Sequence, residues 1–134
     1  LFARIDISNF FYSISRRRVQ SALDRIGVAK ARFYAQWSTV VSPFANPRYA
    51  LPYGFVQSPI LASLVVATSD LGQHLLGLPA SVKGGVYVDD ISLSSDDAGE
   101  LQQAYDMTLA VIAADGFAVS PAKLRPPAPA IDIF

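Results

Sequence analysis

Two adjacent carboxylates interrupt an apolar stretch of the chain that otherwise has the residues of paired β-strands. The stretch, residues 84–95, reads GGVYVDDISLSS and places Asp89 and Asp90 in its middle. The alternation on both sides predicts a β-hairpin over Val82–Ser94 with its bend at these two residues. Asp is common in surface turns, which is the simplest interpretation. The apolar flanks, and a bend without Gly or Asn, argue against an ordinary two-residue turn in solvent.

A third carboxylate, Asp6, ends a separate apolar run that we expect to form a strand over Leu1–Ile7. An unpaired buried carboxylate is costly, so Asp6 needs a partner. If the first strand lies beside the hairpin, three carboxylates converge and repel one another unless cations neutralise them. Oxygen ligands of this kind suit Mg²⁺ or Mn²⁺. Two such ions, ~3.5–4 Å apart, can clamp the attacking and leaving oxygens of a phosphoryl transfer.

The other helices and strands must position these acids. The helix-start, helix-stop and strand signals in the sequence predict that they form an α+β fold. We expect helices capped at Ser15 and stopped at Gly27, from Val28 to about Val41, from Ser58-Pro59 to about Leu76, and from the Asp97 cap to Ala114. A short strand follows in 115–120, residues 121–130 are too rich in proline for regular structure, and 131–134 start another strand. Helices would cover one face of an antiparallel sheet.

Some conspicuous side chains have plain structural interpretations. Phe33 and Trp37 are expected to point into the core from the second helix. His74 stands alone late in an apolar helix, with no neighbours that would make it a ligand. The run Arg16–Arg18 is expected to be a solvated first helical turn, although a cationic helix start is electrostatically unfavourable and leaves a phosphate contact open.

Composition bounds the class of protein. The chain has 134 residues, enough for one compact domain, with 51% hydrophobic and 16% charged residues. The low charge and the start on Leu1 lead us to expect an excerpt of a larger protein. The net charge of zero gives no global electrostatic argument for nucleic acid, and does not exclude it. The absence of cysteine excludes disulfides and thiolate metal sites. No segment is predicted to span a membrane or act as a signal peptide.

Four stretches in order resemble the palm motifs A to D of reverse transcriptases: RIDISNFFYSI (4–14), LPYGFVQSPILASL (51–64), YVDD (87–90) and GFAVSPAKL (116–124). The resemblance spans nearly the whole chain. Among the subgroups of the family, the sequence is most similar to the bacterial retron, group II intron and defence-associated enzymes. It implies a polymerase palm over 1–134 with βαββαβ-like topology and helices on one face. The fingers, the thumb and most of the triphosphate-binding residues would lie outside it.

The resemblance also assigns catalytic roles. Asp6 and Asp89 match the main metal-binding aspartates, Asp90 a weaker or indirect ligand, and Ile7 a backbone carbonyl ligand to two Mg²⁺ or Mn²⁺ ions. Lys123 matches the motif D lysine, a general acid or charge stabiliser near the pyrophosphate. An ordinary solvated lysine is an equally good interpretation of Lys123.

Substrate-binding roles follow from the same motifs. Phe11 matches the steric gate that excludes a 2′-hydroxyl, with Phe10 in the core; core packing is the alternative for both. Tyr53 and Gly54 match the loop that contacts nucleotide and template, where Tyr53 replaces the family's usual Gln. Tyr87 is expected near the primer end and Val88 near the nucleotide. Ser63 and Ser120 also replace residues that are usually Asn.

The implied activity is RNA-directed DNA synthesis, in which a primer 3′-hydroxyl attacks a dNTP. The partners would be dNTPs, a nucleic acid template and primer, and the rest of the polymerase chain, in the bacterial cytoplasm and without a membrane. Tyr53 leaves open a template-independent or protein-primed DNA polymerase of an antiviral defence system. An inactive palm serving as a structural or nucleic-acid-binding subunit is the other alternative, and it predicts loss of a metal-binding aspartate.

Overall fold

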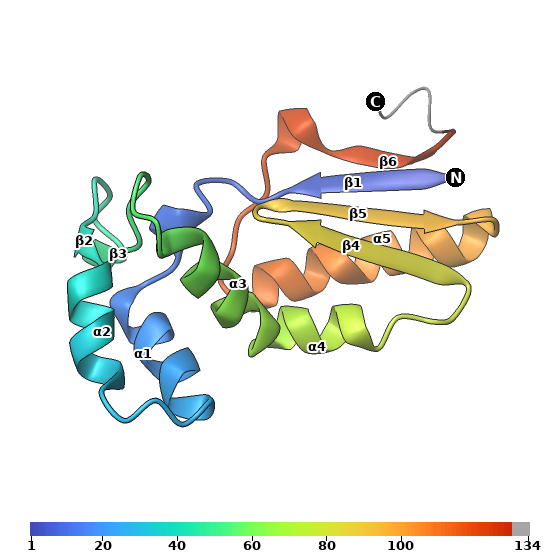
Figure 1. The fold of residues 1–134 in the computed structure, drawn as a ribbon. Coiled ribbons are helices and arrows are strands. Elements are labelled where there is room, and N and C mark those ends of the chain that lie inside the picture. Colours follow the sequence, from blue (N-terminus) through green and yellow to red (C-terminus); the bar gives the residue numbers. More distant parts are fainter. Residues whose placement is uncertain (130–134) are drawn as a thin grey trace. The chain divides into compact units, whose positions relative to one another are not determined.

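A computed structural model of the protein describes residues 1–129 (Figure 1). The chain forms two compact units. The first contains Leu1–Ser8 and the chain from Asp70 onward, and the second contains Asn9–Ser69. Within residues 1–129, none of the helices combines the length and the apolar character needed to cross a membrane.

The first unit is built on a four-stranded antiparallel sheet. Its strands are β1 (Phe2–Asp6), β4 (Val82–Tyr87), β5 (Asp90–Ser95) and β6 (Arg125–Ala128). Their order across the sheet is β4-β5-β1-β6, so the first strand lies beside the hairpin, as Figure 1 shows. The pairing of β1 with β5 places Asp6 opposite Asp90 and Arg4 opposite Ser92.

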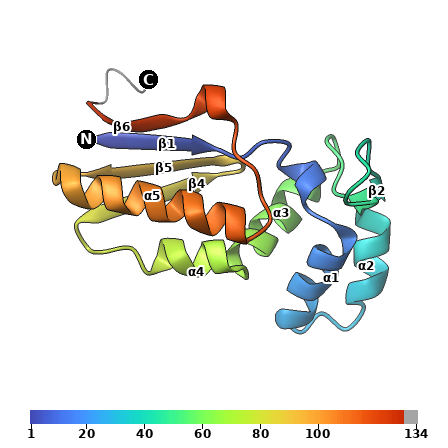
Figure 2. The same ribbon diagram turned by 180° about the vertical axis from the view of Figure 1, so that it is seen from behind.

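The two faces of this sheet differ because side chains alternate along a strand. One face is apolar and buried, with Ala3 and Ile5 from β1 and Ile91 and Leu93 from β5. Helix α5 (Ala98–Ala114) packs across that face, and α4 (Asp70–Leu76) packs against α5 (Figure 2). The predicted antiparallel sheet with helices on one face is therefore confirmed. The opposite face carries the polar side chains of β1 and β5.

Helix α5 begins where the sequence predicts. The Asp97 side chain accepts a hydrogen bond from the Glu100 amide at 2.9 Å, which satisfies one of the free donors of the first turn. His74 of α4 is bonded to the Thr108 hydroxyl of α5 at 2.8 Å. Because that hydroxyl donates its proton to the Ala104 carbonyl at 2.7 Å, the His74 Nε2 atom is the donor to Thr108. This pair ties α4 to α5.

The proline-rich segment differs from the prediction of irregular structure. Pro121–Lys123 form a 3₁₀ turn, and Arg125–Ala128 form strand β6 on the edge of the sheet. Proline has no amide proton and is tolerated on edge strands, which is why this composition still forms a strand. The strand expected in 115–120 is reduced to a single bridge between Val119 and Ile7. The strand predicted for 131–134 lies outside the described residues.

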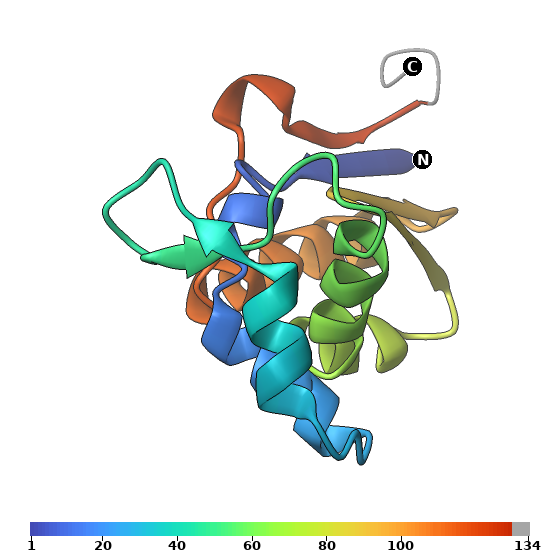
Figure 3. The same cartoon turned by 60° about the vertical axis from the view of Figure 1, so that its left-hand side comes forward.

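The second unit is mainly helical (Figure 3). It contains a 3₁₀ turn at Phe11–Ser13, α1 (Arg16–Arg25), α2 (Ala31–Ser38), the short strands β2 (Val40–Val41) and β3 (Tyr49–Ala50), and α3 (Ser58–Ala67). Helix α1 packs against α2 and α3. The Ser15 side chain accepts from the Arg18 amide, and Gly27 has a φ of +82°, so the predicted cap and stop are confirmed.

Two helix predictions in this region are wrong. Phe33 and Trp37 were expected in the core but are 51% and 71% exposed, because α2 instead turns Ala31 and Ala35 inward. Helix α2 also ends at Ser38, and the β-branched pair Val40–Val41 forms a strand instead.

The single helix predicted from Ser58 to about Leu76 is also divided. Helix α3 ends at Ala67 and α4 begins at Asp70. The hydroxyl groups of Thr68 and Ser69 donate to the carbonyls of Leu64 and Val66 at 2.9 and 2.7 Å. Hydroxyl side chains that bond nearby carbonyls compete with helical hydrogen bonding, which accounts for a break at this place.

Candidate active site

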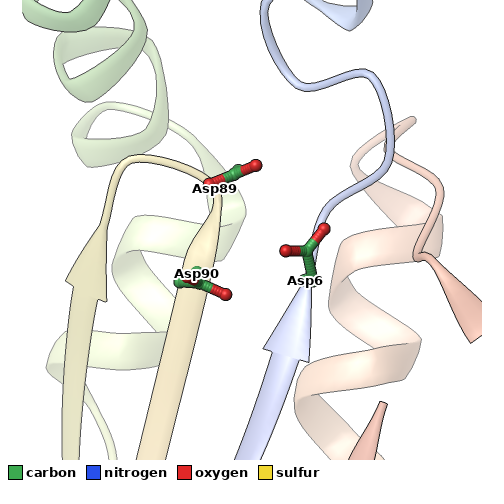
Figure 4. A group of neighbouring side chains, drawn as sticks. All are labelled: Asp6, Asp89 and Asp90. Carbon is green, nitrogen blue, oxygen red and sulfur yellow. The ribbon is translucent and has the colours of Figure 1, made fainter. Parts of the chain in front are cut away.

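Three carboxylates meet at one end of the four-stranded sheet. Asp6 ends β1, Asp90 begins β5 directly opposite it, and Asp89 lies in the turn before β5. Each offers an oxygen, and these oxygens all lie within 4.8 Å of one another. Asp6 is buried and the other two are half-buried. Figure 4 shows the three side chains on the ends of neighbouring strands, and we call them the acidic cluster.

The turn that presents Asp89 is tight and conformationally unusual. Tyr87 pairs with Asp90, so Val88 and Asp89 form a two-residue turn, one residue earlier than the predicted bend. Type I′ and II′ hairpin turns need a positive φ at their first central residue. Val88 occupies that position with a φ of +57°. The Asp89 carbonyl accepts the Ile7 amide at 2.9 Å, which fixes the turn against the end of β1.

Two cations flank the acidic cluster. Arg4 donates from Nε to Asp90 Oδ1 at 3.1 Å and from Nη2 to Asp90 Oδ2 at 2.7 Å. Lys123 Nζ lies 3.8 Å from Asp6 Oδ2, and its side chain is 68% exposed. The paired carboxylate of Asp90 in turn raises the pKa of Arg4 above its usual range. Lys123 thus lies at the edge of the acidic cluster, and its predicted role near the pyrophosphate stays a prediction.

Asp89 has the least compensated charge of the three. Burial raises the pKa of Asp89, and the negative charges of Asp6 and Asp90 raise it further. Its own backbone amide and the more distant Lys123 act in the opposite direction. A carboxylate in this environment is stabilised by a nearby cation, because their attraction offsets both the desolvation penalty and the repulsion from the other carboxylates.

The segment that follows α5 holds Asp6 in place. The Ser120 amide donates to the Asp6 carbonyl at 2.9 Å, and the Ser120 hydroxyl donates to Asp6 Oδ1 at 3.2 Å. The Ser8 amide donates to the Ala118 carbonyl at 2.8 Å. Asp6 is thus fixed through its backbone and its side chain, so its position is set by the sheet and this segment together.

The donor set fits a divalent cation. All the converging ligands are carboxylate oxygens, which hard cations such as Mg²⁺ prefer. Opposite oxygens around a Mg²⁺ ion lie about 4.2 Å apart, from metal–oxygen distances of about 2.1 Å. The spread of 4.8 Å in the acidic cluster is close to that value.

The predicted substrate-binding residues fall in both units. Tyr87, on the first unit's hairpin, is 79% exposed, whereas Val88 is half-buried. In the second unit Phe11 is buried, with its ring centroid 4.9 Å from that of Tyr53. Gly54 adopts a φ of +93°, a conformation that glycine tolerates best.

The rings of Phe10 and Phe11 are both buried, whereas Tyr53 is exposed. Phe10 is 2% exposed, as expected of a core residue, and Phe11 is 7% exposed. Phe11 is therefore also a packing residue in this unit, and its role as a gate stays a prediction. Tyr53, with 55% of its surface exposed, has room to contact a ligand.

The sequence reasoning missed two residues of this site, Arg4 and the hydroxyl of Ser120. Arg4 is two residues from Asp6 in the same strand, so both side chains lie on the same face of the sheet. A cation two residues before Asp6, in a strand that is otherwise apolar, was the available signal. The cross-strand register that brings Arg4 to Asp90 is not readable from the sequence.

Comparisons with known proteins give a consistent picture. The sequence model described as "Reverse transcriptase (RNA-dependent DNA polymerase)" matches residues 1–126. A comparison with curated proteins gives no match. Telomerase from Candida albicans is similar in structure, with a TM-score of 0.68, 13% identity, and coverage of 96% of this chain and 28% of the telomerase chain.

The foamy viral protease-reverse transcriptase in complex with an RNA/DNA hybrid is a second similar structure. It has a TM-score of 0.58 and 23% identity, and the match covers 93% of this chain and 14% of that one. At these identities the likeness shows the fold, a reverse transcriptase palm of mixed helix and antiparallel sheet. The family match extends over nearly the whole chain, and the chain accordingly belongs to the reverse transcriptase (RNA-dependent DNA polymerase) family.

Proposed function

We propose that this chain is the catalytic palm of an RNA-directed DNA polymerase that joins a dNTP to the 3′-hydroxyl of a primer. The observation that carries the proposal is the acidic cluster, whose carboxylate oxygens lie within 4.8 Å of one another at the end of a rigid sheet. An inactive palm predicts loss of one of these aspartates, and Asp6, Asp89 and Asp90 are all present.

Asp6 and Asp89 would hold two divalent ions, Mg²⁺ or Mn²⁺, together with the backbone carbonyl of Ile7. Bound ions would supply Lewis-acid chemistry, favouring the ionised primer hydroxyl and the charge that develops on the phosphate. The chain's own contribution is to fix the ligand oxygens in place before substrate arrives. The Ile7–Asp89 and Ser120–Asp6 hydrogen bonds, of 2.9 Å each between backbone atoms, do this.

Lys123 would act on the leaving pyrophosphate, as a charge stabiliser or a general acid. Its ammonium group lies 3.8 Å from Asp6, which places it at the edge of the acidic cluster. Its side chain is 68% exposed and therefore free to turn toward a bound triphosphate. Neutralising charge at the departing group is the role that such a cation supports.

The nucleotide and the nucleic acid would be contacted from the residues around the turn and from the second unit. Tyr87, with its largely exposed ring, and Val88 would contact the primer end and the nucleotide. Phe11 would exclude a 2′-hydroxyl, and Tyr53 with Gly54 would contact nucleotide and template. The similar foamy viral enzyme is described in complex with an RNA/DNA hybrid and with double-stranded DNA, which supports nucleic acid partners here.

Incorporation of labelled dNTPs by the full-length protein tests the proposal. Reactions would contain Mg²⁺ or Mn²⁺, with a primed RNA template in one arm and no nucleic acid in the other. We expect incorporation that needs both metal and template and falls by at least about 10³-fold in Asp89→Asn, comparable to loss of a main electrostatic group. The matched control is Asp106→Asn on α5, which should keep full activity, because within residues 1–129 the Asp106 side chain is hydrogen-bonded only by Gln102.

The two arms separate the alternatives. Incorporation without template would keep the polymerase chemistry and favour the template-independent or protein-primed enzyme, with Tyr53→Gln as the next variant. Absence of incorporation in both arms, from protein that unfolds cooperatively, would refute the proposed activity and favour a structural or nucleic-acid-binding palm.

A further inference from the structure

Arg4 makes the most specific polar contact in the acidic cluster. Its guanidinium donates to both oxygens of Asp90, at 3.1 and 2.7 Å. Two parallel bonds from a planar fork fix the orientation of the carboxylate as well as neutralising it. The contact of Lys123 with Asp6, at 3.8 Å from an exposed side chain, is longer and imposes no such orientation.

The strand register sets this contact. Asp6 pairs with Asp90 and Arg4 with Ser92, so Arg4 and Asp90 are diagonal neighbours on the polar face of β1 and β5. Their side chains are 36% and 23% exposed, so water competes less for this pair than for a fully exposed one. The backbone of a paired sheet holds both ends of the interaction in position.

The pair limits what Asp90 can offer to a cation. Each Asp90 oxygen already accepts one charge-assisted hydrogen bond, which leaves it a weaker donor to a metal ion. A guanidinium beside the carboxylate also repels an approaching divalent cation. The carboxylates of Asp6 and Asp89 are more available to a cation, because in the described part of the chain neither forms a bidentate ion pair.

We propose that Arg4 is a positioning residue: its bidentate ion pair holds Asp90 in the indirect role that the family resemblance implies for it, and leaves Asp6 and Asp89 to meet the divalent ions. This rests on the proposed function, because it assumes that the acidic cluster binds divalent ions. Arg4 then has two effects. It prevents Asp90 from adding a third unneutralised charge to the metal-free cluster, and it fixes which two carboxylates meet the ions.

Binding of Mn²⁺ alone to the full-length protein, followed by the electron paramagnetic resonance signal of free Mn²⁺, tests the assignment without an activity assay. The decisive variant is Arg4→Gln with Asp90→Asn, which removes the pair and leaves the net charge of the site unchanged. We expect its affinity for Mn²⁺ to stay within about threefold of the unchanged protein. The matched control Asp89→Asn makes the same chemical change at a direct ligand and should weaken binding about 10- to 100-fold, the range for loss of metal-site groups.

Three outcomes are informative. If the double variant loses as much affinity as Asp89→Asn, Asp90 is a direct metal ligand. Its ion pair with Arg4 must then break when the ion binds, and the Arg4 assignment is overturned. If Mn²⁺ binds and neither variant weakens it, the ions bind elsewhere, and both the assignment and the metal site of the proposed function fail. If Asp89→Asn weakens binding and the double variant does not, the metal site of the proposed function stands, and the melting temperatures of the Arg4 variants decide whether Arg4 holds Asp90.

The melting temperature of the metal-free protein provides a second readout that does not depend on Mn²⁺. Arg4→Gln alone leaves the Asp90 carboxylate beside Asp6 and Asp89 without its counter-ion, so the melting temperature should fall. Adding Asp90→Asn should restore much of the loss, and Arg4→Lys should lose less than Arg4→Gln because it keeps the charge. An unchanged melting temperature in Arg4→Gln would overturn the role of Arg4 in the ion pair, whatever the metal result.

Discussion

Replacing Val88 with glycine should relieve strain in the turn that carries Asp89. Val88 has a φ of +57°, where the Cβ atom of an L-residue crowds the following carbonyl oxygen. That crowding costs about 1–2 kcal/mol, and a β-branched residue is among the least suited to it. Glycine has no Cβ atom and removes this cost.

Glycine also has costs of its own, so the effect is best measured as a difference. The substitution adds about 0.5–1 kcal/mol of backbone entropy to the unfolded chain and removes a half-buried apolar side chain. The matched control is Val86→Gly, two residues earlier in β4, where the valine is 48% exposed and the backbone is regular strand. The entropy loss is similar at the two sites, whereas the burial loss is larger at Val88, which is less exposed than Val86. Val88→Gly should therefore be more stable than Val86→Gly by up to about 1–2 kcal/mol, the strain less this difference in burial.

Urea unfolding of both variants beside the unchanged protein gives the two free energies of unfolding. The linear-extrapolation slopes should agree among the three proteins, because the surface exposed on unfolding hardly changes. Equal destabilisation by the two substitutions would refute the reasoning, since it would mean that the positive φ of Val88 stores no free energy. A difference of the expected sign would identify Val88 as a strained residue beside the acidic cluster.

Three further predictions concern stability. Burial lowers the pKa of His74 below 6.5, so between the two pKa values the unfolded chain binds a proton that the folded protein does not. Stability should therefore fall as the pH drops from 6.5 toward the folded-state pKa. Thermal melts at several pH values should show a weaker dependence of the melting temperature on pH in His74→Gln. Gly85→Ala should raise the free energy of unfolding in urea by about 0.5–1 kcal/mol, because its new Cβ atom meets open space. Gly84→Ala should raise it less, because its Cβ atom would lie 2.9 Å from Leu78 Cδ1. Asp97→Ala removes the cap of α5 and should cost about 1 kcal/mol by the same measurement; a loss below about 0.3 kcal/mol would contradict the capping role.

The convergence of the three carboxylates could be predicted because it follows from local sequence features. Asp6 and Asp89 each end or interrupt an apolar strand, and an isolated carboxylate there needs a partner. The caps at Ser15 and Asp97 were likewise readable, because a side-chain oxygen near free amides is a local signal. The bacterial subgroup, the defence role and the cytoplasmic location stay predictions.

The features that could not be predicted depend on contacts between distant residues. The pair of Arg4 with Asp90 requires the register of β1 against β5, which the alternation of side chains does not specify. The inward face of α2 is another such case. Its small residues, Ala31 and Ala35, are buried, whereas hydrophobicity alone favoured Phe33 and Trp37. Residues 125–128 form a strand only because a place exists for them at the edge of the sheet.

That edge position has a consequence for the behaviour of the protein in solution. An open strand edge presents amide donors and carbonyl acceptors to which a strand from another molecule can add, which is a route to aggregation. Pro126 and Pro127 fall in the middle of β6 and supply no amide protons. Because successive amides point to opposite sides of a strand, one of these two adjacent prolines lies on the outer side and offers no donor to an incoming chain. The composition that appeared to exclude a strand in this segment thus protects the outer side of β6 from pairing with a second molecule.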